Sequence, residues 1–164
     1  MRFVTTCILT VSLFFQGGTA PLAQSDGAVM GKVSGAFFAL SVADVAKLSR
    51  WYQEKLGFRA LSQGESPNKI AKFAILEGAG TIIELIQHSQ AKPRGGVAPS
   101  ASDAYLIHGI FKVGMVVADL DGVYRELKKR DAPIAYDLMR AKDVPMRSFS
   151  VRDGEGNLIQ FFGK

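Results

Sequence analysis

The chain has 164 residues, of which 48% are hydrophobic and 21% are charged, and its formal net charge is +5. This composition excludes a disordered polyelectrolyte and suits one compact domain with a sizeable core. The densest basic run, Lys128–Arg130, falls at the end of a predicted helix, where the helix dipole favours cations. We therefore predict no nucleic-acid partner, because no longer basic stretch and no interleaved aromatic residues accompany this run.

Residues 1–23 have the pattern of a secretory signal peptide. Arg2 is followed by a nine-residue apolar run, Cys7–Phe15, and then by small residues up to Ala23. The alternative is a membrane anchor, but crossing the hydrocarbon layer needs about 20 apolar residues. We expect an exported protein, periplasmic or extracellular, with a short tail over 24–35 and no membrane contact after cleavage. Cleavage also removes the only cysteine, so the mature chain has no disulfide and no thiolate.

The rest of the sequence contains an internal repeat. The stretches 36–61 and 111–136 share a strand pattern, the tripeptide Val-Ala-Asp and an amphipathic helix pattern. Asp44 and Asp119 each precede an apolar stripe with spacings of three and four, so each is predicted to cap a helix. Three short strand patterns follow each helix: 58–62, 70–77 and 81–87 in the first copy, and 134–136, 146–152 and 157–162 in the second. The unit is β-α-β-β-β, with the first module at 36–87 and the second at 110–164.

Residues 88–109 join the modules and are rich in Pro, Gly, Ala and Ser. The segment is too long for a turn, so it is either a flexible linker or a loop that covers a binding surface. Lys92 and Arg94 could contact an anionic ligand, although the composition alone favours a solvated linker. No site residue is predicted there.

Two such modules resemble the vicinal oxygen chelate superfamily, which includes glyoxalase I, extradiol dioxygenases, and the bleomycin and fosfomycin resistance proteins. The resemblance is carried by LSVADVAKLSRWYQEKLGF, GTIIELI, VGMVVADLDGVYRELKKR and VRDGEGNLIQFF. It implies an α+β fold in which two βαβββ modules form a curved mixed sheet, as one domain over residues 36–163. It also implies that the modules pair either within one chain or across a homodimer.

Metal-dependent members of this superfamily hold an ion with residues from four strand positions. Carried over residue by residue, these positions fall on Phe37, Glu84, Lys112 and Gln160. Only Glu84 is a good metal ligand, because phenylalanine and the lysine ammonium group have no lone pair to donate and the glutamine amide is a weak donor. We therefore predict no cofactor, with a divalent metal ion as the alternative.

The two histidines, His88 and His108, do not restore such a site. His108 lies four positions before Lys112, which corresponds to roughly 13 Å along an extended strand. His88 lies four positions beyond Glu84, at the other rim. Lone histidines near strand ends are more often surface or hydrogen-bonded residues than ligands, so Lys112 is expected at the centre.

Strand alternation places Phe37, Glu84, Lys112, Gln160 and Phe162 on the side of the sheet that faces a mostly apolar cup. Glu84 and Lys112 are predicted to form an ion pair, to which Gln160 adds a hydrogen bond. The same groups would bind a small, possibly anionic or aromatic ligand, with Phe37 and Phe162 as apolar walls. In the alternative, the ion pair only fills and neutralises the cavity.

Three functions remain open. The first is an exported, metal-independent protein that binds a small molecule, in the manner of the bleomycin resistance proteins. The second is a metal-dependent lyase, isomerase or dioxygenase of the glyoxalase type, and the third is a structural or partner-binding module. Catalytic residues are not assigned, because the chain offers no Ser-His-Asp or Cys-His set. We favour the first function, since the losses fall on ligand positions while the fold signals around them are intact.

Overall fold

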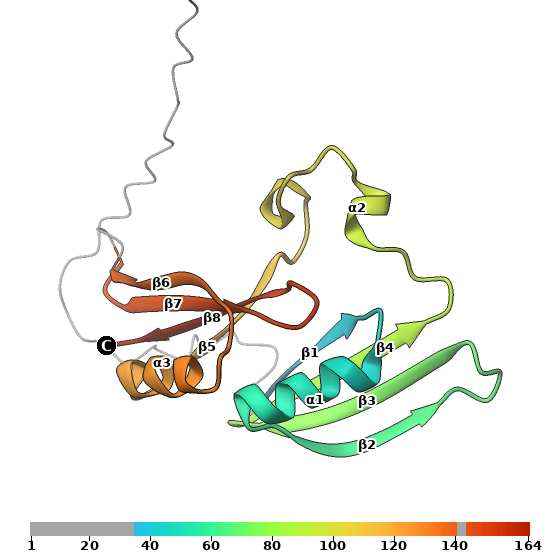
Figure 1. The fold of residues 1–164 in the computed structure, drawn as a ribbon, viewed down its shortest axis with the longest axis horizontal. Coiled ribbons are helices and arrows are strands. Elements are labelled where there is room, and N and C mark those ends of the chain that lie inside the picture. The colour runs from blue at the N-terminus through green and yellow to red at the C-terminus, as the bar shows by residue number, and fades with distance from the viewer. Residues whose placement is uncertain (1–34, 141–143) are drawn as a thin grey trace, which may run out of the picture. The chain divides into compact units, whose positions relative to one another are not determined.

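The computed structural model describes residues 35–140 and 144–164 (Figure 1). The expected signal peptide and most of the short tail after it lie outside the described residues. None of the helices in the described part of the chain has the length and hydropathy of a membrane span.

The first module contains four strands and one helix, in the order β-α-β-β-β. The elements are β1 (Ala36–Ser41), α1 (Val45–Leu56), β2 (Arg59–Glu65), β3 (Ala71–Gly78) and β4 (Thr81–His88). The sheet order is β1-β4-β3-β2 (Figure 1), with β1 parallel to β4 and the other pairs antiparallel.

The second module repeats this arrangement. Its elements are β5 (Lys112–Val116), α3 (Leu120–Lys129), β6 (Ile134–Arg140), β7 (Arg147–Arg152) and β8 (Leu158–Gly163), with sheet order β5-β8-β7-β6. Between the modules, the linker contains the short helix α2 (Arg94–Val97) and the 3-10 turn η1 (Ala104–Leu106). The predicted α+β class with two βαβββ modules is therefore confirmed.

The predicted helix starts are also confirmed. The side chain of Asp44 accepts a hydrogen bond from the backbone N–H of Lys47 at 2.9 Å, and that of Asp119 accepts one from Gly122 at 2.8 Å. Gly57 ends α1 with φ of 73°, a left-handed conformation in which a side chain would be strained.

Each sheet has one buried face and one open face. Ile83 and Leu85 on β4 and Ile159 on β8 are fully buried in the core that also holds the apolar stripes of α1 and α3. On the opposite faces, Phe37 is 63% exposed and Val116 is 75% exposed. Alternation along the strands thus assigned the faces correctly, and the open faces are the ones predicted to line the cup.

Several predicted strand bounds were wrong. The second copy of the repeat was predicted to start its strand pattern at residue 111, but β5 begins at Lys112, whose partner Leu158 is the first residue of β8. Residues before Lys112 therefore find no backbone partner in that sheet. Strands β2 and β6 run to Glu65 and Arg140, because backbone pairing with β3 and β7 continues where the side chains no longer alternate.

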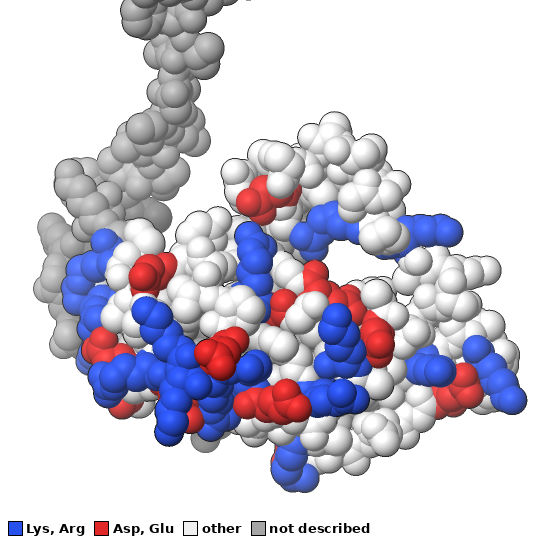
Figure 2. Space-filling view, in the orientation of Figure 1, with Lys and Arg blue, Asp and Glu red and all other residues white. Residues whose placement is uncertain are grey.

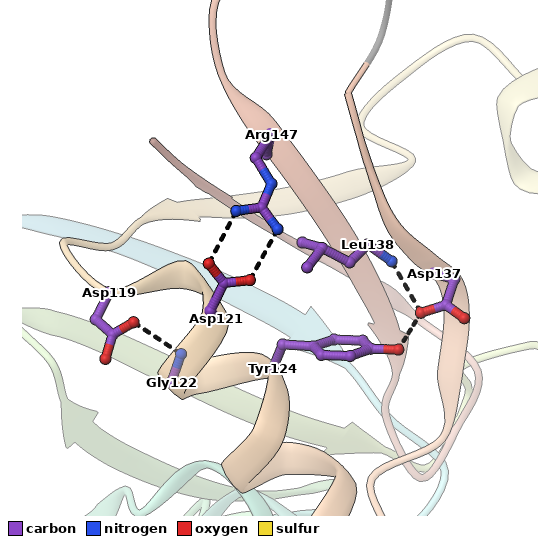
Figure 3. Close-up of polar contacts among 7 residues, drawn as sticks. All are labelled: Asp119, Asp121, Gly122, Tyr124, Asp137, Leu138 and Arg147. Carbon is purple, nitrogen blue, oxygen red and sulfur yellow. Dashed lines mark hydrogen bonds and ion pairs between the residues drawn. The ribbon is translucent and has the colours of Figure 1, made fainter.

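Helix α3 is fixed on its sheet by polar contacts (Figure 3). The Arg147 guanidinium on β7 donates to both carboxylate oxygens of Asp121, each at 2.8 Å. This hydrogen bonding lowers the pKa of the Asp121 carboxyl. The Tyr124 hydroxyl donates to Asp137 on β6, which also accepts the backbone N–H of Leu138. These contacts orient α3 against β7 and the edge strand β6 of the second sheet.

The β7–β8 turn of the second module contacts the first module around the start of α1. The Glu155 carboxylate accepts hydrogen bonds from the backbone N–H groups of Ala43 at 2.8 Å and Asp44 at 3.0 Å. The buried Tyr52 hydroxyl on α1 donates to Asp153 at 3.1 Å. A turn predicted only to join two strands therefore also links the two modules.

Candidate functional site

The five predicted ligand-binding residues lie on the open faces but are not all brought together. Lys112 and Gln160 line one cavity of about 240 Å³ on the second module, and Phe37, Glu84 and Phe162 do not line it. Phe37 is exposed, whereas Glu84 and Phe162 are half-buried. The site thus divides between two sheets, and the second sheet carries the enclosed part.

The predicted ion pair is not formed within one chain. Among the described residues, ion pairs join Arg59 to Glu77, Arg130 to Glu126 and Arg147 to Asp121. The Lys112 ammonium group instead lies 5.2 Å from the centroid of the Phe111 ring, a cation–π distance. Sequence alternation placed Glu84 and Lys112 on the correct faces but gave no information on whether the two sheets face each other in one chain.

The predicted hydrogen bond of Gln160 to this pair was also wrong. The Gln160 side-chain N–H donates to the Ser148 hydroxyl at 3.0 Å. Ser148 is a diagonal neighbour on β7, because Gln160 is directly opposite Ser150. The Gln160 side-chain oxygen is buried and has no hydrogen-bond partner among the described residues. Such an acceptor costs about 1–3 kcal/mol unless a ligand or water donates to it.

The cavity combines cations with aromatic rings. Three cations line it, against one carboxylate, that of Asp103, which accepts the backbone N–H of Ala104 at 2.6 Å. The rings of Tyr105 and Phe111 meet edge to face at 6.4 Å between centroids. The main polar and aromatic side chains of the lining are Arg94, Asp103, Tyr105, Phe111, Lys112, Tyr136, Ser148, Ser150, Arg152 and Gln160.

Sequence reasoning identified only Lys112 and Gln160 in this lining and missed its other residues. The linker supplies Arg94, Asp103 and Tyr105 to the lining of this cavity. Two aromatic residues close together in a Pro- and Gly-rich segment, Tyr105 and Phe111, were the available signal. His88, by contrast, accepts the backbone N–H of Gln90 at 3.1 Å, which is the local hydrogen-bonding role expected of it.

The residues at the superfamily's metal positions do not fit a divalent ion. Of the four, only Glu84 offers an anionic oxygen, and Lys112 brings a positive charge to the position of a ligand. Within 35–140 and 144–164, no three His, Cys, Asp or Glu side chains gather closely enough to hold an ion. We derive no chemical step through a metal.

Two βαβββ modules, each with a helix on one face of its sheet and polar groups on the other, define a glyoxalase-type α+β protein. Residues 36–161 match the family model of the Glyoxalase/Bleomycin resistance protein/Dioxygenase superfamily, and the chain belongs to this superfamily.

Solved structures with similar folds include three from different sources. A glyoxalase family protein from Enterococcus faecalis is 18% identical, with a TM-score of 0.62 over 80% of this chain and 97% of that chain. TioX from Micromonospora sp. ML1 is 24% identical, with a TM-score of 0.57 over 80% and 98%. A glyoxalase I variant from Zea mays is 16% identical, with a TM-score of 0.59 over 77% of this chain and 43% of that chain. No curated protein matches the chain. At these identities the likeness shows the fold alone.

Proposed function

We propose that the protein is an exported, metal-independent binding protein whose ligand is a small aromatic anion held in the cavity of the second module. The observation that carries the proposal is the lining itself: three cations, Arg94, Lys112 and Arg152, surround a space walled by aromatic rings. A cavity of about 240 Å³ is slightly smaller than the roughly 300–1,000 Å³ of drug-sized pockets. A ligand built on one substituted ring suits that size.

Each part of the ligand has a counterpart in the lining. A carboxylate or phosphate would lie near Lys112 and Arg152, and its ring would pack against Tyr105 and Tyr136. A hydroxyl or amide N–H on the ring would donate to the Gln160 oxygen, which has no partner among the described residues. In this proposal the Lys112 ammonium group would attract the anionic group of the ligand, as a bound metal ion does in metal-dependent relatives.

The protein is also proposed to act as a homodimer. The open faces expose Phe37, Ile82 and Val116 by 63%, 40% and 75%, a burial pattern that a second copy would complete. In such a dimer, Glu84 on the first sheet of one copy would approach Lys112 on the second sheet of the other, by opposite charge. The second candidate function, a metal-dependent enzyme of the glyoxalase type, would require the partner copy to supply oxygen or nitrogen ligands.

The test uses protein purified after export from expressing cells, and intact mass shows whether a leader has been removed. Calorimetric titration compares 4-hydroxybenzoate and phenyl phosphate with the uncharged 4-hydroxybenzamide. Lys112→Met should abolish binding of the two anions, whereas the control Lys47→Met, on an exposed helix position, should leave it unchanged. Equal binding of the uncharged amide, or stoichiometric Zn²⁺, Ni²⁺, Mn²⁺ or Fe²⁺ by mass spectrometry after desalting, would contradict the proposal.

A further inference from the structure

A second hollow, a groove of about 1010 Å³, lies at the rim of the first module. Its walls come from the end of β1, the β2–β3 turn, the segment from the end of β4 to α2, and the β7–β8 turn. Figure 2 shows Lys and Arg side chains bordering the hollow beside the linker that carries α2. We call this hollow the rim groove.

The rim groove has an uncompensated positive charge. Four cations line it: Lys69, Lys72, Lys92 and Arg94. Each ion pair formed among the described residues involves other groups. The one carboxylate in the lining is that of Glu155, and backbone N–H groups at the start of α1 already donate to it. An anionic occupant would therefore meet four cations without displacing an existing ion pair.

The exposure of the apolar residues, the lack of aromatic rings in the lining and the size of the rim groove argue against several kinds of ligand. Ile70 and Val97 are 44% and 71% exposed, so the rim groove does not enclose an alkyl chain. Among the described residues, no Phe, Tyr or Trp lines it, so this part of the chain offers none of the stacking platforms on which single-stranded nucleic acids bind. A small inorganic anion would contact only part of a hollow of this size.

We propose that the rim groove binds an acidic, extended segment of a partner protein, with carboxylates toward the lysines and apolar side chains on Ile70 and Val97. An extended chain directs alternate side chains to opposite sides, so its carboxylates and its apolar side chains can meet different parts of a lining that contains both cations and exposed apolar residues. Lys112 does not line the rim groove, so this proposal is independent of the ligand cavity. Arg94 lines both spaces and is left unchanged in the test.

The experiment measures the binding of a fluorescently labelled octapeptide of alternating Glu and Leu. Its fluorescence anisotropy is followed as protein purified after export is added. Two control peptides replace Glu with Gln or Leu with Ser. The groove variant carries Lys72→Glu and Lys92→Glu, and the matched control carries Lys47→Glu and Lys164→Glu, which make the same change in net charge at exposed positions outside the groove. Thermal melting establishes that both variants are folded.

The groove variant should weaken binding by about tenfold or more, and the control variant by less than about twofold. Raising NaCl to about 0.3 M should weaken binding to the unmodified protein as well. The proposal is overturned if both variants lose affinity equally, or if the Gln peptide binds as tightly as the Glu peptide. It is also overturned if the peptide fails to bind while a single-stranded oligonucleotide or a phosphatidylglycerol vesicle binds through the same lysines.

Discussion

Removing the Tyr52 hydroxyl should weaken the link between the two modules by a measurable amount. Tyr52 is fully buried on α1, and its hydroxyl donates to Asp153, which is itself 4% exposed. The Asp153 carboxylate also accepts the backbone N–H groups of Glu155 and Asn157, each at 2.9 Å, and the Asn157 side-chain N–H at 2.9 Å. One buried carboxylate therefore organises the β7–β8 turn and holds α1 against it.

The magnitude follows from these partners. Tyr52→Phe removes one hydrogen bond to a charged acceptor, which is worth about 1.5–3 kcal/mol, and the lower end is expected because Asn157 still donates to the same oxygen. Asp153→Asn removes the charge from all four hydrogen bonds while keeping the shape, so about 3 kcal/mol is expected. Because the two groups touch, their effects should fall short of additivity by about 1 kcal/mol.

The assay is urea unfolding of the unmodified protein, both single variants and the double variant, arranged as a double-mutant cycle. A coupling free energy within about 0.3 kcal/mol of zero would refute the reasoning, because residues that do not interact also depart from additivity by about that amount.

The pH dependence of the same contact provides a second readout. Burial, and next the charge of Asp153, raise the pKa of the Tyr52 phenol far above its ordinary value. The contribution of the protonated Tyr52 phenol to the free energy of unfolding is fully present below the ordinary pKa of tyrosine, about 10. It declines at higher pH, because the unfolded chain then loses a proton that the folded protein keeps. The unmodified protein should lose about 1.4 kcal/mol per pH unit more than Tyr52→Phe does above pH 10. If the difference in free energy of unfolding between the unmodified protein and Tyr52→Phe stayed constant from pH 8 to 11, the raised pKa of Tyr52 would be contradicted.

The remaining predictions concern the second module. Arg147→Ala should lower the melting temperature modestly, and less so in high salt. The difference from the unmodified protein should shrink as the pH falls below about 4, the ordinary pKa of aspartate, because Asp121 in the unfolded chain then takes up a proton before the folded carboxyl with its lowered pKa does. Gly163→Ala should cost about 1–3 kcal/mol in urea unfolding, because the added carbon would lie 2.7 Å from a leucine side chain of α3. Gly95→Ala is the control for Gly163→Ala, since a carbon added at Gly95 has no atom within 4 Å. Val116→Asp should convert the proposed dimer to monomer in light scattering, and an unchanged mass would contradict pairing through the open faces.

Sequence patterns were sufficient for the fold because each pattern has a local physical cause. Asp44 and Asp119 cap helices through backbone groups three residues away, and Gly57 ends a helix through its own φ. Alternation decides which side chains of a strand meet the core, so the buried positions on β4 and β8 could be read directly. Such signals need no knowledge of the rest of the chain.

The candidate site could not be predicted in the same way, because it depends on contacts between distant segments. Glu84 and Lys112 belong to two sheets, and no periodicity says whether these sheets face each other in one chain or across two. Tyr105 enters the cavity from a 3-10 turn inside a segment of low-complexity composition, where no apolar period exists. The path of the linker was a further unknown, since it determines whether Arg94 and Tyr105 reach the cavity.

Under the proposed function, the residues at the metal positions would change the chemistry of the site without changing the sign of the charge that the site attracts. A divalent ion and the group of Arg94, Lys112 and Arg152 both attract anionic oxygens, but only the ion supplies directed coordination bonds. Ammonium and guanidinium groups can hold a carboxylate or phosphate in several orientations, so the fit of the ring must provide the specificity. In the proposed complex the ring would contact Tyr105 in the linker and Tyr136 on β6. Selectivity for a ligand should therefore depend more on these two tyrosines than on the strand positions that define metal-dependent relatives.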